Sequence, residues 1–456
     1  MRRLLEDAAR RSIAYLEGLA SRGVAPSAEA LAAISVLDGP LSEAPTDPES
    51  VLKLLDETCS PASMAMAGPR FFGFVIGGSL PVTVAANWLA AAWDQNAAFH
   101  SVTPAAALLE RVALRWLIDI LGLPPGSEAG FVTGATLANF AALAAARHAV
   151  LTRAGWNVEA DGLFGAPPIT VIVGEEAHSS LFKALGLLGL GRKRVVRVPA
   201  DGQGRMRADA LPPVSGPTIV CTQAGNVNTG AIDPVGEISR SAHASGAWVH
   251  VDGAFGLWAA AAPGRAHLAR GVSEADSWAT DAHKWLNVPY DSGLAFARDP
   301  DALRAAMAIT ADYLPAPDAA RNPSDYTPEL SRRARGVEVW AALKALGRTG
   351  VADLVENTCR HATRFAEGLR AAGYRVLNDV VLNQVLVSFG EPQATARVIS
   401  AIQSDGTCWC GSTVWHGTPA MRISVSSWAT TASDVDASLA AMIRTARAHG
   451  APGRSA

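Results

Sequence analysis

The middle third of the chain alternates short apolar runs, rich in valine and isoleucine, with longer stretches of helical periodicity. Strands that are buried on both faces are apolar throughout, and the helix after each strand returns the chain to the edge where the next strand begins. The alternation therefore predicts an α/β fold with a mostly parallel sheet wrapped by helices. The candidate strands are 130–133, 169–173, 218–222, 247–251 and 277–280, and the candidate helices are 137–150, 181–188, 235–245 and 337–346.

The sequence divides into three expected parts, since a chain of 456 residues is too long for one ordinary core. Residues 1–67 have charges spaced along an amphipathic helical pattern, which predicts an N-terminal helical segment. Residues 68–344 form the expected large domain. Residues 345–456 form a smaller C-terminal α/β domain, with candidate strands at 375–388 and 420–427.

Composition excludes several classes of protein. With 49% hydrophobic and 18% charged residues, a disordered chain is not expected. The formal charge of -3 leaves no excess of cations for a nucleic acid backbone. The N-terminus lacks the apolar stretch of a signal peptide, and the longest apolar run is too short to span a bilayer, so we expect a cytoplasmic protein without membrane contact. Five scattered cysteines indicate reduced thiols and no metal site.

Asp252 ends the apolar run AWVHV and precedes the small residues GAFG. A carboxylate at such a point can cap an ordinary turn. It can also lie beside a pyridine nitrogen, where its charge keeps that nitrogen protonated and lets the ring accept electrons. Ala254, two residues later, is small enough to lie beneath such a ring.

Lys284 follows a candidate strand in the run DSWATDAHKW. Most lysines are solvated surface residues. This one lies among Asp281, His283 and Trp285, which is an unusual composition for an exposed surface. The sequence therefore predicts that Lys284 lies in a binding site and not on the solvated surface.

Two further strand ends have residues that suit a phosphorylated ring. In TGATLAN, Gly134, Ala135 and Thr136 lie between a strand and a long helix, where free backbone N–H groups bind phosphate. The same residues also make an ordinary helix cap. His178, after the next strand, can stack on a ring, cap its helix or lie in the core.

Pyridoxal 5'-phosphate explains all four strand ends together. This cofactor needs a lysine to bind it covalently, a carboxylate beside the pyridine nitrogen, an anion cradle for the phosphate and packing on both faces of the ring. Open parallel sheets place such groups at the carboxyl ends of their strands. The four candidate loops are located there.

The motifs HVDGAFG and DSWATDAHKW, with HSS upstream and RFFGFV near residue 70, resemble the group II pyridoxal phosphate-dependent decarboxylases of fold type I. That group includes the aromatic-L-amino-acid, histidine, glutamate and tyrosine decarboxylases, and the resemblance runs from about residue 70 to 428. It implies decarboxylation of an L-amino acid to an amine, and a homodimer with active sites at its interface. The cofactor contacts that it implies involve Ala135, Thr136, His178, Asp252, Ala254, His283 and Lys284.

The resemblance also suggests which residues meet the substrate. The residues that match the family's pocket are mostly apolar and include Phe74, Val75, Phe99 and His100. An acidic side chain would need a cationic partner, so this lining favours an aromatic or other apolar amino acid. Arg422 can bind a carboxylate, or it can pair with an acid in the small domain.

The stretch 315–331 contains three prolines and no apolar period, which predicts a long loop that closes over the substrate. Matching this stretch to the family's mobile loop, with a gap of about two residues, places Tyr326 at the position of the proton donor. An exposed loop tyrosine without a catalytic role is the other interpretation.

The chain departs from the family at the loop after the strand 218–222. Gly225, Asn226 and Val227 replace the usual Gly-Thr-Thr turn, and Leu137 replaces an acidic residue. The substrate therefore cannot be inherited from better-known members. Transamination, oxidative deamination to an aldehyde and a non-catalytic binding role are the alternatives to decarboxylation, and the last is disfavoured because His178, Asp252 and Lys284 are all present.

Overall fold

The computed structural model describes residues 1–309, 311–312 and 320–449. The contacts within it group the chain into two compact units. The sheet unit comprises 79–362 and 378–384, and the terminal unit comprises 1–78, 363–377 and the residues from Val385 onward. The three-part division expected from the sequence stays a prediction beside this grouping.

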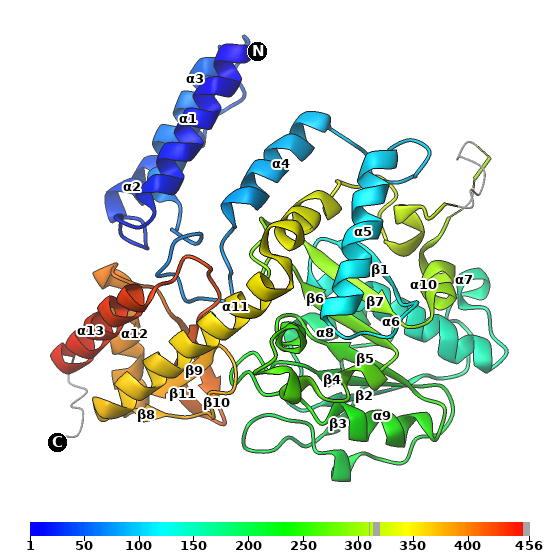
Figure 1. The fold of residues 1–456 in the computed structure, drawn as a ribbon. Coiled ribbons are helices and arrows are strands. Elements are labelled where there is room, and N and C mark those ends of the chain that lie inside the picture. Colours follow the sequence, from blue (N-terminus) through cyan, green and yellow to red (C-terminus); the bar gives the residue numbers. More distant parts are fainter. Residues whose placement is uncertain (310, 313–319, 450–456) are drawn as a thin grey trace. The chain divides into compact units, whose positions relative to one another are not determined.

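The sheet unit is built around seven strands in the order β1-β7-β6-β5-β4-β2-β3 (Figure 1). Only β7 runs antiparallel to its neighbours β1 and β6, and the other pairs are parallel. The strands are β1 (Glu128–Val132), β2 (Thr170–Gly174), β3 (Val196–Val198), β4 (Thr218–Gln223), β5 (Trp248–Asp252), β6 (Ser277–Asp281) and β7 (Gly293–Ala297). The helices are α4 (Pro81–Trp93), α5 (Pro104–Ile120), α6 (Ala135–Arg153), α7 (Val158–Asp161), α8 (Ser179–Leu187), α9 (Val235–His243), α10 (Pro300–Met307) and the first part of α11 (Gly336–Ala371).

The expected α/β class and the mostly parallel sheet are confirmed. All five candidate strands of the middle third correspond to strands, with ends that differ by one or two residues. Two strands were missed: β3 has only three residues, and β7 consists of the small-residue run GLAFA. The expected helix 337–346 ends at the kink in α11, where Gly347 has a φ of 60° that only glycine adopts readily.

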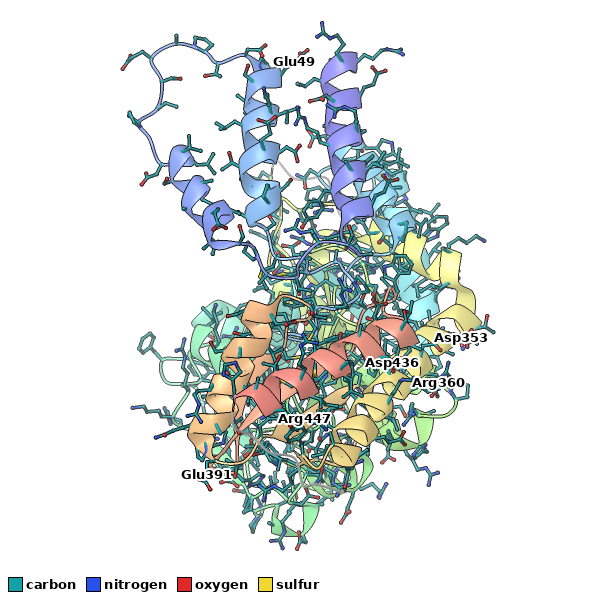
Figure 2. All side chains as sticks on the ribbon, turned by 90° about the vertical axis from the view of Figure 1, so that its left-hand side faces the viewer. Glu49, Asp353, Arg360, Glu391, Asp436 and Arg447 are labelled. Carbon is teal, nitrogen blue, oxygen red and sulfur yellow. The ribbon has the colours of Figure 1, made fainter. Side chains whose placement is uncertain are left out.

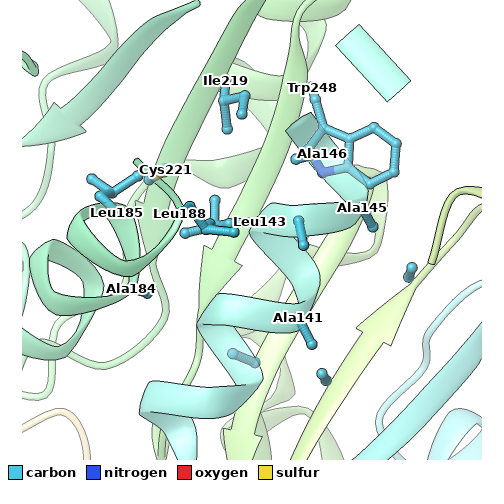
Figure 3. Packing of buried hydrophobic residues seen from close by; sticks show 14 of the residues in the cluster. Ala141, Leu143, Ala145, Ala146, Ala184, Leu185, Leu188, Ile219, Cys221 and Trp248 are labelled. Atoms are coloured by element: carbon cyan, nitrogen blue, oxygen red, sulfur yellow. The ribbon is translucent and has the colours of Figure 1, made fainter. Parts of the chain in front are cut away.

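Helix α6 lies against the middle of the sheet and forms the main core with it (Figure 3). Its alanine-rich sequence has high helix propensity and brings only small side chains to the sheet, so the helix can approach closely. Ala141 and Ala145 on this helix are fully buried, and the larger side chains of Trp248 on β5 and Leu185 on α8 complete the cluster. This position brings the amino end of α6 to the carboxyl ends of the strands.

The terminal unit combines the N-terminal helices with a four-stranded sheet of order β10-β11-β9-β8. One expectation was wrong here: 375–388 is two strands and not one, because β8 turns back and pairs antiparallel with β9. The elements are α1 (Arg2–Gly18), α2 (Ala28–Ala33), α3 (Pro48–Ala62), β8 (Arg375–Val376), β9 (Gln384–Ser388), α12 (Pro392–Asp405), β10 (Gly411–Trp415), β11 (Thr418–Ser424) and α13 (Ala432–Ala448).

Ion pairs connect the helices of the terminal unit. Arg11 on α1 donates to Asp56 on α3 at 2.9 Å, and both side chains are partly buried. Asp436 on α13, labelled in Figure 2, pairs with Arg364 on α11 at 2.6 Å on the exposed surface, where such a pair contributes little free energy. Among the residues that the structure describes, no helix has the length and apolar character needed to cross a membrane.

A buried carboxylate organises the segment that leads into α11. Glu110 on α5 is 1% exposed and accepts hydrogen bonds from Arg332 at 2.8 Å and Arg321 at 3.1 Å. Arg332 also donates to the carbonyl of Phe131 on β1 at 2.8 Å. These hydrogen-bonded ion pairs therefore hold residues 321–332 against β1, at the edge of the sheet.

Replacing Glu110 by Gln should destabilise the fold strongly. The substitution keeps the shape of the side chain but leaves the fully buried guanidinium of Arg332 without an anion, which costs roughly 3 kcal/mol. Arg321 loses one of its two carboxylate partners and keeps Glu128 at 2.7 Å. Denaturant unfolding followed by circular dichroism measures the loss in free energy of unfolding. The matched control is Asp119→Asn on the same helix, because Asp119 forms an exposed pair with Arg348 that should contribute less than about 1 kcal/mol. Equal effects of the two variants would show that the Glu110 network does not stabilise the fold.

Candidate active site

The residues predicted to form the site lie at one edge of the seven-stranded sheet. Gly134 follows β1, His178 follows β2, Asp252 ends β5 and Lys284 follows β6. Strand β1 runs in the same direction as β6, because both pair antiparallel with β7. All four strands therefore present their carboxyl ends at this edge, as the rule for parallel sheets requires.

Lys284 is anchored by the buried carboxylate of Asp281. Its Nζ lies 3.0 Å from Asp281 Oδ2, and 18% of the lysine side chain is exposed. The other carboxylate oxygen of Asp281 accepts the N–H of Ala135, the first residue of α6, at 2.6 Å. Asp281 therefore joins the lysine to the start of the helix, a role that the sequence did not reveal.

His283 is buried as a neutral imidazole. Its Nδ1 accepts the backbone N–H of Ser292 at 3.0 Å, so the ring proton lies on Nε2, which is 3.6 Å from Asp281 Oδ1. Burial lowers the pKa of His283; the charge of Asp281 opposes this shift, and that of Lys284 adds to it. The ring of Tyr290 stacks on the imidazole with 4.2 Å between centroids. The site thus has an N–H donor next to the start of α6.

Gly293 on β7 allows the start of α6 to approach that strand. A Cβ atom on Gly293 would lie 2.5 Å from the Cα of Gly134, which no real structure tolerates. The close approach leaves the first turn of α6, with half-buried Thr136, at the carboxyl edge of the sheet. The amino end of a helix of 19 residues attracts anions through its N–H groups and its dipole.

Asp252 is buried, with both carboxylate oxygens met by donors. Its Oδ2 accepts from Asn139 Nδ2 at 3.1 Å, and its Oδ1 accepts the N–H of Ala254 at 3.3 Å. The carbonyl of Ala254 in turn accepts the N–H of Asp281 at 2.9 Å. Asp252 therefore shapes its turn, and that turn connects it to the loop that contains Lys284.

His178 caps helix α8 and lines a small cavity with Asp252. Its Nδ1 accepts from the backbone N–H of Ser180 at 3.3 Å, and Ser180 Oγ lies 2.8 Å from the same nitrogen. The cavity is also lined by Cys221, Gln223 and Asp233. The sequence allowed His178 to stack on a ring, to cap its helix or to lie in the core. Its contacts with Ser180 show that it caps the helix, and they fix the imidazole beside the cavity.

These groups fit pyridoxal 5'-phosphate. The cofactor requires a lysine that is largely shielded from solvent, a buried carboxylate with donors on both oxygens, a helix start next to a histidine, and an imidazole fixed beside a cavity. Lys284 would bind it covalently, and Asp252 would face the pyridine nitrogen. The phosphate would be bound by Ala135, Thr136 and His283, and the ring would lie between His178 and Ala254.

Asn226, which departs from the family pattern, folds its own turn after β4. Its Oδ1 accepts the N–H groups of Asn228 at 2.9 Å and Thr229 at 3.2 Å, and its Nδ2 donates to Gln223 at 3.2 Å. An asparagine that bonds to the backbone two residues later is a common turn former. The side chain is therefore used within the loop.

Tyr326 lies in a packed turn and not in an open loop. The turn Pro323–Tyr326 lies against β1, and the guanidinium of Arg321 covers the tyrosine ring at 4.5 Å from its centroid. Burial raises the pKa of Tyr326. Residues 313–319, which include the start of the expected loop 315–331, lie outside the described residues. The described part, from 320 to Ser331, packs against β1, and the pair of Arg321 with Glu110 holds it there.

The expected substrate residues occur in both units. In the terminal unit, Phe74 and Val75 have φ values of 54° and 60°, a strained conformation for side chains of this kind. Such strain is concentrated at functional sites. Arg422 lies on β11, and burial lowers its pKa. In the sheet unit, Phe99 and His100 are half-buried, and the N–H of His100 donates to Asn322 at 3.1 Å.

Comparison with known proteins identifies the family. Residues 34–390 match the family model described as the pyridoxal-dependent decarboxylase conserved domain. Aromatic-L-amino-acid decarboxylase from Bacillus atrophaeus is 27% identical over 383 residues, which cover 81% of this chain and 77% of that protein. Phenylacetaldehyde synthase from Arabidopsis thaliana is 25% identical over 414 residues, covering 84% and 83%.

The fold matches as well. The structure of Oryza sativa TDC with PLP and tryptamine superimposes with a TM-score of 0.90 at 22% identity and covers 98% of this chain and 97% of that one. The expected fold type I is thereby confirmed, and so is the resemblance drawn from the sequence motifs. The chain belongs to the pyridoxal-dependent decarboxylase family.

Proposed function

We propose that this enzyme converts an aromatic or other apolar L-amino acid into its amine and carbon dioxide. Lys284 would hold the cofactor covalently, Asp252 would lie beside its pyridine nitrogen, and His178 would pack on its ring. The bound cofactor supplies an electron-poor ring that accepts the electrons of the bond to the departing carboxylate.

The observation that supports these roles is the connection between the ends of β5 and β6. Ala254 donates to Asp252 and accepts from the N–H of Asp281, which in turn pairs with Lys284. The backbone of one residue thus sets the spacing between a buried carboxylate and a partly exposed lysine. A covalent anchor and a charge for the ring nitrogen must be fixed relative to one another, because catalysis depends on their positions.

The aromatic substrate is supported by the character of the residues and by the relatives. Phe74, Val75 and Phe99 offer apolar surface, and the only charged side chain among the proposed contacts is Arg422. Arg422 would pair with a carboxylate of the substrate. An acidic side chain would be bound without its own cation, which costs free energy. The two curated relatives named above act, by their names, on aromatic amino acids or make an aromatic aldehyde.

Oxidative formation of an aldehyde is the alternative reaction, and one relative is named as an aldehyde synthase. In that reaction the amino acid loses carbon dioxide and ammonia, and one molecule of oxygen is reduced to hydrogen peroxide while water supplies the aldehyde oxygen. The outcome depends on whether a protein group returns a proton to the alpha carbon. We propose Tyr326 as that group, with His178 as the next candidate.

The reaction can be tested with a panel of amino acids. The protein loaded with pyridoxal 5'-phosphate should release carbon dioxide fastest from tryptophan, tyrosine or phenylalanine, more slowly from leucine, and least from glutamate. The apolar contacts cannot compensate the desolvation of a second carboxylate. The measurements are kcat/KM from released carbon dioxide and the identity of the organic product. A preference for glutamate would contradict the proposed substrate class.

Lys284→Ala is the control for the same panel. It should abolish turnover and the cofactor that borohydride fixes to the protein, while the fold remains intact by circular dichroism. Lys183, which lies on α8 and is not among the site residues, offers a matched substitution that should change neither. Peptide mapping that finds the reduced cofactor on another lysine would remove Lys284 from the site.

Tyr326→Phe should change the product more than the rate of substrate loss. The ring and its contact with Arg321 remain, but the transferable proton is gone. Loss of carbon dioxide needs no such donor, so aldehyde, ammonia and hydrogen peroxide should accumulate in place of amine when oxygen is present. Chromatography of the products and a peroxide assay distinguish the two reactions. Amine formed at the normal rate would mean that Tyr326 only anchors its segment.

We also propose that the chain forms a homodimer. The helices α1 and α3 leave large apolar side chains exposed, among them Leu5, Val51 and Leu54. Helix α4 in the sheet unit does the same with Leu89 and other residues. Large apolar patches on the surface of a monomer are uncommon and mark interaction sites. The cytoplasmic location expected from the sequence stays a prediction.

Light scattering should give twice the mass of the chain at micromolar concentration. Leu54→Arg should shift the protein toward the monomer, because it places a charge in an apolar contact. Lys53→Gln at the neighbouring exposed position removes a charge and no apolar area, so it should leave the mass unchanged. A monomeric mass for the unaltered protein would contradict the proposal.

A further inference from the structure

Behind Asp252, four buried side chains form one continuous chain of hydrogen bonds, which we call the relay. Trp248 Nε1 donates to Ser277 Oγ at 2.8 Å, and Ser277 Oγ lies 2.9 Å from His250 Nδ1. His250 Nε2 lies 2.8 Å from Asn139 Oδ1, and Asn139 Nδ2 donates to Asp252 Oδ2 at 3.1 Å. Trp248 is 5% exposed, and the other three are fully buried.

The chemistry of the two ends fixes the direction of every bond between them. An indole can only donate, and a carboxylate can only accept. Asn139 must therefore turn its amide nitrogen toward Asp252 and its oxygen toward the histidine. His250 must then have its proton on Nε2 and an unprotonated Nδ1, to which the hydroxyl of Ser277 donates.

The neutral state of His250 agrees with this direction. Burial lowers the pKa of His250 to about 3, so the ring has one proton at physiological pH. The proton must be on His250 Nε2, because Asn139 Oδ1 faces that nitrogen and can only accept. The opposite orientation of the Asn139 amide would place Oδ1 against a carboxylate oxygen of Asp252. The relay therefore has a single consistent arrangement when Asp252 is ionised.

Other groups face Asp252 from the cavity side. His178, Cys221 and Asp233 line that cavity with it, and Ala254 donates to the second carboxylate oxygen. Cys221 and Asp233 form no hydrogen bond with the four relay side chains among the contacts described. The relay is thus an independent support, reaching Asp252 from α6 and from the interior of the sheet.

We propose that Asn139, supported by His250 and Ser277, is a positioning residue that holds the carboxylate of Asp252 in a fixed orientation, and thereby sets how tightly the pyridine nitrogen of the cofactor is bound. The inference rests on the proposed role of Asp252. It extends that role to three side chains that do not touch the cofactor themselves. The relay also accounts for two polar residues, Asn139 and His250, in otherwise apolar stretches of sequence.

The test compares two probes that differ only at the ring nitrogen. Pyridoxal 5'-phosphate and its 1-deaza analogue, in which C–H replaces the nitrogen, are titrated into the cofactor-free full chain, and binding is followed by absorbance. The unaltered protein should bind the natural cofactor more tightly. Asn139→Leu should reduce that preference by about tenfold or more, which is the usual loss for a hydrogen bond to a charged group. Affinity for the analogue should stay the same.

If Asn139 only stabilised the fold, Asn139→Leu would lower the affinity for both probes equally. Ser277→Ala should reduce the preference less than Asn139→Leu, because His250 keeps its Nε2 proton. Asn383→Ala is the matched control, an equally buried asparagine of the sheet unit outside the relay, and it should leave the ratio of the two affinities unchanged. An unchanged ratio in Asn139→Leu, or an equal loss for both probes, would overturn the proposal.

Asp252→Asn separates failure of the relay from failure of the proposed function. If the unaltered protein prefers the natural cofactor and Asp252→Asn removes that preference, the role of Asp252 stands whatever the relay variants do. No preference in the unaltered protein overturns both. Should Asn139→Leu not fold, ¹⁵N chemical shifts of the unaltered protein, assigned with His250→Gln, report the tautomer of His250. A proton on Nδ1 would overturn the relay.

Discussion

A carboxylate buried in a protein core must be met by donors, and three such groups determine how this enzyme is arranged. Glu110 gathers two arginines and fastens the segment before α11 to the sheet. Asp281 joins Lys284 to the first turn of α6. Asp252 accepts from α6 and from its own turn. An unpaired buried charge costs far more free energy than an exposed one. The fold must therefore place a donor against each of these carboxylates.

The sheet was predictable from the sequence because its strands are buried on both faces. The runs that became β2, β4 and β5 are apolar enough to be recognised, and Asp252 and Lys284 could be placed at strand ends for the same reason. Strand β7 was not predicted, because its Gly and Ala residues give no periodic signal. This strand nevertheless sets the direction of β1, which pairs antiparallel with it. The interval 375–388 was misread because two short antiparallel strands have the same composition as one long strand.

The finer parts of the site depend on contacts between residues far apart in the chain. Asn139 and His250 are separated by 111 positions, and their hydrogen bond exists only because α6 rotates that asparagine toward the sheet. The sequence did contain a signal, since a polar residue in the alanine-rich helix and another in the strand AWVHV both need partners when buried. The packing of Tyr326 under Arg321 had no such signal, because prolines and polar residues around it are typical of loops.

The contact between Gly134 and Gly293 has a consequence for redesign of this enzyme. A Cβ atom on Gly293 would press on the backbone of Gly134, so no side chain fits there unless the first turn of α6 moves away from β7. A Cβ atom on Gly134 would instead meet the ring of His283 at 3.1 Å, a contact that a small shift of that side chain relieves. A substitution library should therefore leave Gly293 unchanged and can include Gly134, so the freedom to redesign differs between the two partners of one contact.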